Sequence, residues 1–150
     1  MKTKKLCLYA VVMAIYIVCT IINPIGYGVL QFRMSAVLSV LPFTKSNFKL
    51  PLIVAVALAN MYSPLGIIDV LAGMLLWTVA YYVVDRFKMR LIVKLIITAV
   101  LSAFVVGGEL TLVTHAPFVV TSVSIFVSQS VAFAIGYLLK PVFDRLPLNG

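Results

Sequence analysis

Charged residues are scarce in this chain, and acids are the scarcest among them. The 150 residues include twelve Lys and Arg, four Asp and Glu and one His, whereas 63% of all residues are hydrophobic. A soluble domain rarely has such a composition, and a chain of this length could not hide so much apolar surface in one aqueous core. We therefore interpret the chain as a polytopic membrane protein, whose apolar exterior is surrounded by lipid.

The shortage of reactive side chains excludes most enzyme classes. No Gly-x-x-x-x-Gly-Lys phosphate-binding motif occurs, and one histidine with two cysteines gives no set with zinc-ligand spacing. A Ser-His-Asp triad would need His115, which the apolar pattern places in a loop. Cys7 and Cys19 fall roughly 18 Å apart on one helix, too far for a disulfide. We expect neither an enzyme nor a bound metal or cofactor.

The net charge of +8 does not indicate a nucleic-acid partner. The bases form short clusters between apolar runs, without the interleaved aromatics of a nucleic-acid surface. The basic start at Lys2–Lys5 followed by the apolar run 6–22 raises the question of a signal peptide. That run is long for a signal core, and no small-x-small cleavage site follows it. We predict a retained first helix instead.

Six apolar segments predict an all-α domain of six transmembrane helices covering residues 1–150. Glycines and prolines lie mostly between these segments, as is usual at helix ends. The second and third segments are short for a full span, so we expect them to tilt or to bury their ends in the bundle. The six segments are 6–22, 32–42, 47–61, 66–84, 89–109 and 117–140.

The distribution of bases predicts that both termini are cytoplasmic. With that topology, every Lys and Arg except Arg33 falls on the cytoplasmic side, as the positive-inside rule requires. Asp85 and Asp144 lie among those bases and are expected to be ordinary interface charges.

The remaining ionisable residues, Arg33, Asp69, Glu109 and His115, fall near the outer face. Ionisable groups at such depths usually face the bundle interior, where they pair or line a solute site. Polar stripes at helical spacing, including Tyr16 on the first segment and Ser102 on the fifth, indicate the same interior. The pattern predicts an outward-open pocket for a flat polar molecule. The residues expected around it are Tyr27, Gln31, Phe32, Arg33, Asn60, Tyr62, Asp69, Trp77, Glu109 and Gln129.

Each residue also has a purely structural interpretation. Arg33 could extend to the outer headgroups, or it could form an ion pair with Asp69 or Glu109. Trp77 could serve packing alone. Gln129 could simply bond a neighbouring helix.

A pocket without a nucleotide motif needs a partner if the protein transports actively. Ala10 and Ala14, one turn apart on the first helix, form a small-xxx-small pair that would let another helix approach closely. The inner half of the segments is too apolar for an open pore. A secondary carrier or a structural or pore-forming protein remains an alternative.

Four stretches of the sequence resemble the QueT family. "QFRMSAVLSVLPF" and "ANMYSPLGIIDVLAG" are similar to the two central motifs of that family, and "GGELTLV" and "AIGYLLKPVF" fit its closing helices. Members are substrate-binding S components of energy-coupling factor (ECF) transporters. The resemblance thus covers most of the chain.

This resemblance implies a six-helix S component in a bacterial cell membrane. It would bind a queuosine precursor, a deazaguanine base such as preQ1, and would need a transmembrane coupling subunit and two ATPase subunits. The Ala10/Ala14 pair would dock on the coupling subunit. The loop after the first helix, with Gly26, Tyr27 and Gly28, would act as a lid.

Two positions depart from the family pattern. Ala36 follows the serine of the arginine motif, where the family often has an acid, and Ser128-Gln129 replaces a frequent Gly-Glu pair. The missing carboxylates imply a neutral base or a related precursor as an alternative ligand. Arg33 itself is expected to hold Asp69 or Glu109 in place.

Overall fold

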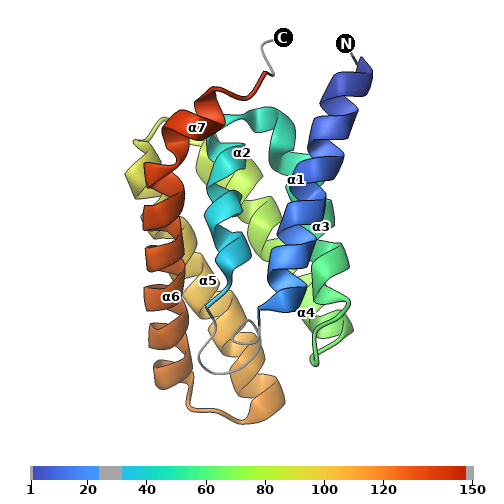
Figure 1. Ribbon diagram of the computed structural model, residues 1–150. Coiled ribbons are helices and arrows are strands. Elements are labelled where there is room, and N and C mark those ends of the chain that lie inside the picture. Colours follow the sequence, from blue (N-terminus) through green and yellow to red (C-terminus); the bar gives the residue numbers. More distant parts are fainter. Residues whose placement is uncertain (1, 24–31, 148–150) are drawn as a thin grey trace.

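The computed structural model describes residues 2–23 and 32–147, and over these ranges the chain is helical, without strands (Figure 1). Four helical stretches of the described residues are long and apolar enough to cross a membrane, which makes this a multi-pass membrane protein. They are α1 (Lys2–Ile22), α5 (Leu91–Thr114), α6 (Phe118–Leu138), and α4 (Ile67–Thr78) continued by a π-helical turn, η3 (Val79–Val83), and a 3-10 turn, η4 (Val84–Arg86).

Two shorter apolar stretches correspond to the second and third predicted helices. The first joins a 3-10 helix, η1 (Met34–Val40), to α2 (Leu41–Thr44), and the second joins η2 (Ser46–Phe48) to α3 (Lys49–Asn60). A 3-10 helix rises about 2.0 Å per residue, against about 1.5 Å in an α-helix. The tighter winding of η1 therefore lengthens an element that is short in residues.

Neighbouring elements stabilise the conformation of η1. A 3-10 run of seven residues is uncommon, because such helices rarely exceed three or four residues. Gly136 of α6 brings the helix backbone against η1, because a Cβ there would lie 2.6 Å from the Val37 carbonyl oxygen. From the π turn, the Tyr81 hydroxyl donates a hydrogen bond of 3.1 Å to the Ser39 carbonyl. Packing thus decides the geometry of η1.

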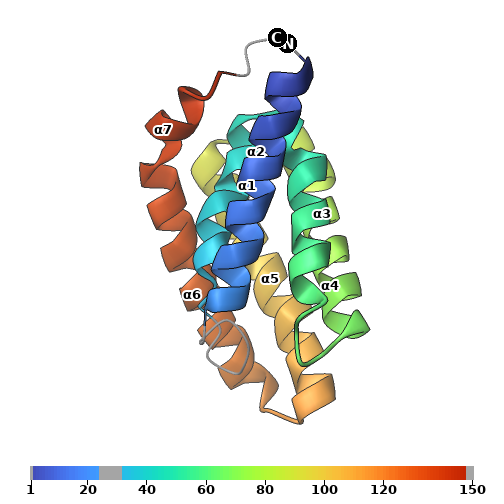
Figure 2. The same ribbon diagram turned by 45° about the vertical axis from the view of Figure 1, so that its right-hand side comes forward.

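The long elements alternate in direction, so that α1 begins and the short α7 (Lys140–Asp144) ends at the same end of the bundle, as Figure 2 also shows. Of the twelve Lys and Arg, all but Arg33 belong to elements or turns at this end, which we call the basic end. The apolar exterior includes large exposed side chains such as Leu6, Leu71, Phe104 and Val119. Such a surface suits a lipid environment.

One predicted boundary was wrong. The fifth helix was expected to end at Glu109, but α5 continues to Thr114 because the residues after Glu109 are compatible with a helix. The helix ends only at His115, whose left-handed conformation (φ 56°) forms the cap and whose N–H donates to the Thr111 carbonyl at 3.0 Å. Glu109 consequently lies inside the helix and not in its last turn.

Candidate functional site

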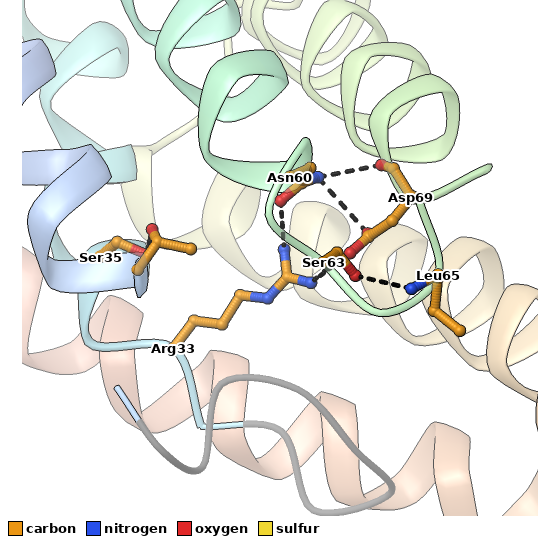
Figure 3. A network of polar contacts seen from close by, with 7 residues as sticks. Arg33, Ser35, Asn60, Ser63, Leu65 and Asp69 are labelled. Atoms are coloured by element: carbon orange, nitrogen blue, oxygen red, sulfur yellow. Dashed lines mark hydrogen bonds and ion pairs between the residues drawn. The ribbon is translucent and has the colours of Figure 1, made fainter. Parts of the chain in front are cut away.

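Arg33, Asn60 and Asp69 form a polar network that joins three elements (Figure 3). Arg33 precedes η1, Asn60 ends α3, and Asp69 lies in the first turn of α4. Arg33 Nη2 lies 3.4 Å from both carboxylate oxygens of Asp69, and Nη1 donates to Asn60 Oδ1 at 3.4 Å. Asn60 Nδ2 donates to the Asp69 carbonyl at 2.9 Å. Of the two ion pairs considered for Arg33, with Asp69 or with Glu109, the one with Asp69 is present in the structure.

This network is almost fully sequestered. Asp69 is 2% exposed, and Asn60 is 1% exposed. Gly73, one turn beyond Asp69, makes room for it, because a Cβ at that position would lie 2.5 Å from Asn60 Nδ2. Burial of a charge is costly unless the charge is paired and hydrogen-bonded, and here Arg33 and Asn60 supply both forms of compensation to Asp69.

Glu109 is the buried acid that lacks such compensation. It is 6% exposed, and neither carboxylate oxygen has a hydrogen-bond partner among the described residues. Asp69 and Arg33 both lie within electrostatic range of it. Across from α5, the side-chain atoms Ser122 Oγ and Gln129 Nε2 of α6 are also buried without a partner in the described ranges. Unsatisfied buried polar groups are rare in native structures and usually have a functional explanation.

A small polar cavity lies beside this network. Its free volume is about 30 Å³, well below the roughly 300–1,000 Å³ of typical small-molecule pockets. Trp77 forms part of its wall and stacks on Tyr81 with ring centroids 5.2 Å apart. The lining residues are Tyr16, Arg33, Ala36, Leu76, Trp77, Ser102, Val106, Ile125 and Gln129. A solute of the size of a bicyclic base would have to displace some of these side chains.

Most of the predicted site residues in the described ranges converge on this region. Arg33, Asn60 and Asp69 contact one another, and Trp77 and Gln129 share the cavity with Arg33. Glu109 follows Val106 of the cavity wall by three residues, which is one turn of α5. As ligand contacts, all of them remain predictions.

The structure does not bring every predicted residue into the cluster. Tyr62 is 71% exposed in the turn after α3 and does not line the cavity, because the turn directs its ring outward. Gly26, Tyr27, Gly28 and Gln31, which include the predicted lid, lie outside the described residues. Phe32 is described and partly exposed.

Two polar residues of the cavity wall were absent from the predicted lining. Tyr16 and Ser102 both line the cavity, and both are buried. Each belongs to a polar stripe of its helix, so the signal was present in the sequence. Ala36 and Gln129, the two departures from the family pattern, line the same cavity.

The predicted docking pair lies on a free face of α1. Ala10 and Ala14 are both exposed, whereas Val12 and Tyr16 turn into the bundle. Most of the apolar part of α1 is exposed on the outside of the bundle. This helix therefore presents small residues on a surface that another helix could approach.

The fold and the site together indicate a class of membrane protein. The chain is a multi-pass helical membrane protein with an ionisable cluster enclosed between its helices, and its described residues hold no group of three or more His, Cys, Asp or Glu that could bind a metal. Ionisable groups in that setting are typical of solute-handling membrane proteins.

A family comparison gives the particular family. The family model described as QueT transporter matches residues 6–145, and the chain belongs to this family. It is accordingly a transport protein and not an enzyme, and the role of a substrate-binding S component follows from the family. Comparisons with curated proteins and with solved structures give no match.

Proposed function

We propose that this protein is the substrate-capture subunit of an ECF-type importer and that it binds a queuosine precursor, a deazaguanine base such as preQ1. The observation that carries the proposal is the unpaired carboxylate of Glu109 beside the satisfied Arg33–Asp69–Asn60 network, in a member of the QueT transporter family. ATP hydrolysis would be performed by partner subunits, since the sequence has no nucleotide-binding motif.

The network and Glu109 would have different roles in recognition. Asp69 already accepts from Arg33 and Asn60, so its task is to hold the site together. Glu109 has both oxygens available to accept, which suits the adjacent N–H donors of a guanine-like edge or a ligand ammonium group. Gln129 Nε2 could donate to a ligand carbonyl, and Trp77 supplies an aromatic face for stacking.

The topology that we propose has six spans and both termini in the cytoplasm. The basic end supports this topology. Eleven of the twelve Lys and Arg lie there, the exception being Arg33, and bases are usually concentrated on the cytoplasmic side of a membrane protein. The Arg33 network then lies toward the outer face, where a solute arrives. Ala10 and Ala14 would dock on the transmembrane coupling subunit that is shared with two ATPase subunits.

Equilibrium binding tests the substrate proposal. Purified protein would be titrated with deazaguanines, flavins and other vitamins, and a deazaguanine is expected to bind most tightly. Glu109→Gln should weaken that binding by about tenfold or more, the usual contribution of a charge-assisted hydrogen bond. Tight binding of a different vitamin with no response to any deazapurine would overturn the substrate assignment.

A second candidate is an S component for a different vitamin-like solute. Ala36 and Gln129 favour it, because both line the cavity at positions where the family often has acids. The same titration panel distinguishes the two. A secondary carrier would instead show uptake driven by an ion gradient without any ATPase partner, and a structural or pore-forming protein would bind no solute saturably.

A further inference from the structure

An apolar groove lies between α5 and α6, and it shares no lining residue with the Arg33 cavity. It has a volume of about 360 Å³. Leu95 and Phe133 form its floor and are 5% and 2% exposed, while Ile92 and Leu138 stand at its sides. Figure 1 shows α5 and α6 as neighbours along their length.

The groove exists because α6 carries small residues at that level. Ser130 and Ala134, one turn apart, line it where longer side chains would fill the space between the helices. On α6 the lining extends from Ser130 to Leu138, which is about 12 Å along the helix axis. One leaflet of a bilayer has a hydrocarbon depth of about 15 Å, half of the whole core. The length of the groove along α6 is therefore close to the thickness of the acyl-chain layer of one leaflet.

The groove extends toward the basic end, since Ile92 near the start of α5 and Leu138 at the end of α6 belong to its lining. Arg90 immediately precedes α5, Lys88 lies two residues before Arg90, and both are exposed. Among the described residues neither forms an ion pair, whereas Lys140 is paired with Asp144 at 2.8 Å. An apolar groove that extends toward these two bases suits an anionic phospholipid, whose acyl chain is apolar and whose headgroup is negatively charged.

We propose that the α5–α6 groove is a binding site for an anionic phospholipid. One acyl chain lies in the groove over Leu95 and Phe133, and the headgroup phosphate contacts Arg90 and Lys88. The groove has no lining residue in common with the Arg33 cavity, so this proposal does not depend on the proposed substrate.

Native mass spectrometry of the full chain tests the proposal. The protein would be released from detergent after exposure to equal amounts of phosphatidylglycerol and phosphatidylcholine, and bound phosphatidylglycerol should predominate. Ala134→Trp fills the groove and should reduce bound phosphatidylglycerol at least fivefold. Val123→Trp, at an exposed position in the other half of α6, is the matched control and should leave lipid binding unchanged.

Charge variants test the headgroup contact. Lys88→Gln and Arg90→Gln should each lower the preference for phosphatidylglycerol about fivefold, the usual effect of one base near an anionic surface. Lys4→Gln, at the same end but on α1, should not. Equal retention of both lipids by the parent, or unchanged lipid binding in Ala134→Trp, would overturn the proposal. So would a change of oligomeric mass in Ala134→Trp without lipid loss, which would assign the groove to a second copy of this chain.

Discussion

At the scale of single residues, Arg33 illustrates how an apolar chain accommodates an isolated base. Its guanidinium contacts Asp69 and Asn60, which belong to two other elements. Arg33 and Asn60 together donate hydrogen bonds to the buried carboxylate of Asp69. Snorkelling to the headgroups is therefore not its main role, because Arg33 is turned toward the interior network in this structure.

Removal of Arg33 alone should be strongly destabilising. Arg33→Gln leaves Asp69 charged and buried with only Asn60 beside it, which is expected to cost about 3 kcal/mol. The double variant Arg33→Gln/Asp69→Asn removes both charges and should recover most of the loss. Thermal unfolding in detergent measures this, and a double variant as unstable as the single one would contradict the ion-pair account.

Neutralisation of Glu109 should have the opposite effect on stability. Glu109→Gln replaces a buried, unpartnered carboxylate with a neutral amide of the same shape, so the ligand-free protein should gain about 1 kcal/mol. The same variant should lose solute affinity. A gain in melting temperature together with weaker binding is characteristic of a site that is kept unsatisfied for its ligand. Lower stability would instead show that Glu109 serves the fold.

At the scale of elements, glycines set the distances between helices. Gly136 allows α6 to touch η1, whereas Gly108 of α5 has no atom within 4 Å of an added Cβ. At Gly107 an added Cβ would collide with the Ser122 side chain of α6. Close helix contacts of this kind are frequent in membrane bundles, where small residues let backbones approach.

Gly136→Ala and Gly108→Ala form a matched pair that tests this packing. Gly136→Ala should destabilise the bundle by about 1–3 kcal/mol, because the new methyl meets the Val37 carbonyl, which is backbone and cannot move aside easily. Gly108→Ala should be neutral or slightly stabilising, since alanine favours the helix. Melting temperatures in one detergent compare them directly, and equal shifts would contradict the proposed contact.

Ionic contacts at the basic end join further elements. Asp85 of η4 pairs with Lys49 of α3 at 2.6 Å and with Lys94 of α5 at 2.7 Å. Asp85→Asn should therefore destabilise the protein. The loss should be only about 1–2 kcal/mol, because both lysines can extend their ammonium groups to water once the carboxylate is gone. Asp144→Asn, which removes an exposed pair, should produce no measurable change. Unfolding of both variants at low and high salt separates the two cases.

At the scale of the whole molecule, the distribution of bases predicts the orientation in the membrane. In a variant without Cys7 and Cys19, a membrane-impermeant maleimide added outside the cell should label His115→Cys but not Lys88→Cys. Labelling of Lys88→Cys should require permeabilised cells, because the basic end is expected in the cytoplasm. The reverse pattern would invert the proposed topology and place the Arg33 network at the wrong face for uptake.

The sequence by itself determined the class of the protein and its all-helical character. Hydrophobic runs separated by glycine, proline and bases are local signals, and a helix in lipid must satisfy its own backbone. An ion pair of Arg33 with Asp69 or Glu109 could also be predicted, because an isolated base near two isolated acids at one membrane face has few alternatives, but the choice of Asp69 could not. The true end of α5 could not be predicted, since residues 110–114 suit either a helix or a loop start.

Only the tertiary structure decided how the polar residues divide their roles. That Asp69 is satisfied and Glu109 is not depends on Asn60 entering the space left by Gly73, a contact between α3 and α4 that no periodicity encodes. The 3-10 winding of η1 and the α5–α6 groove likewise depend on neighbouring side-chain volumes. Periodicity shows which face of a helix is buried, but packing selects the partner that it meets.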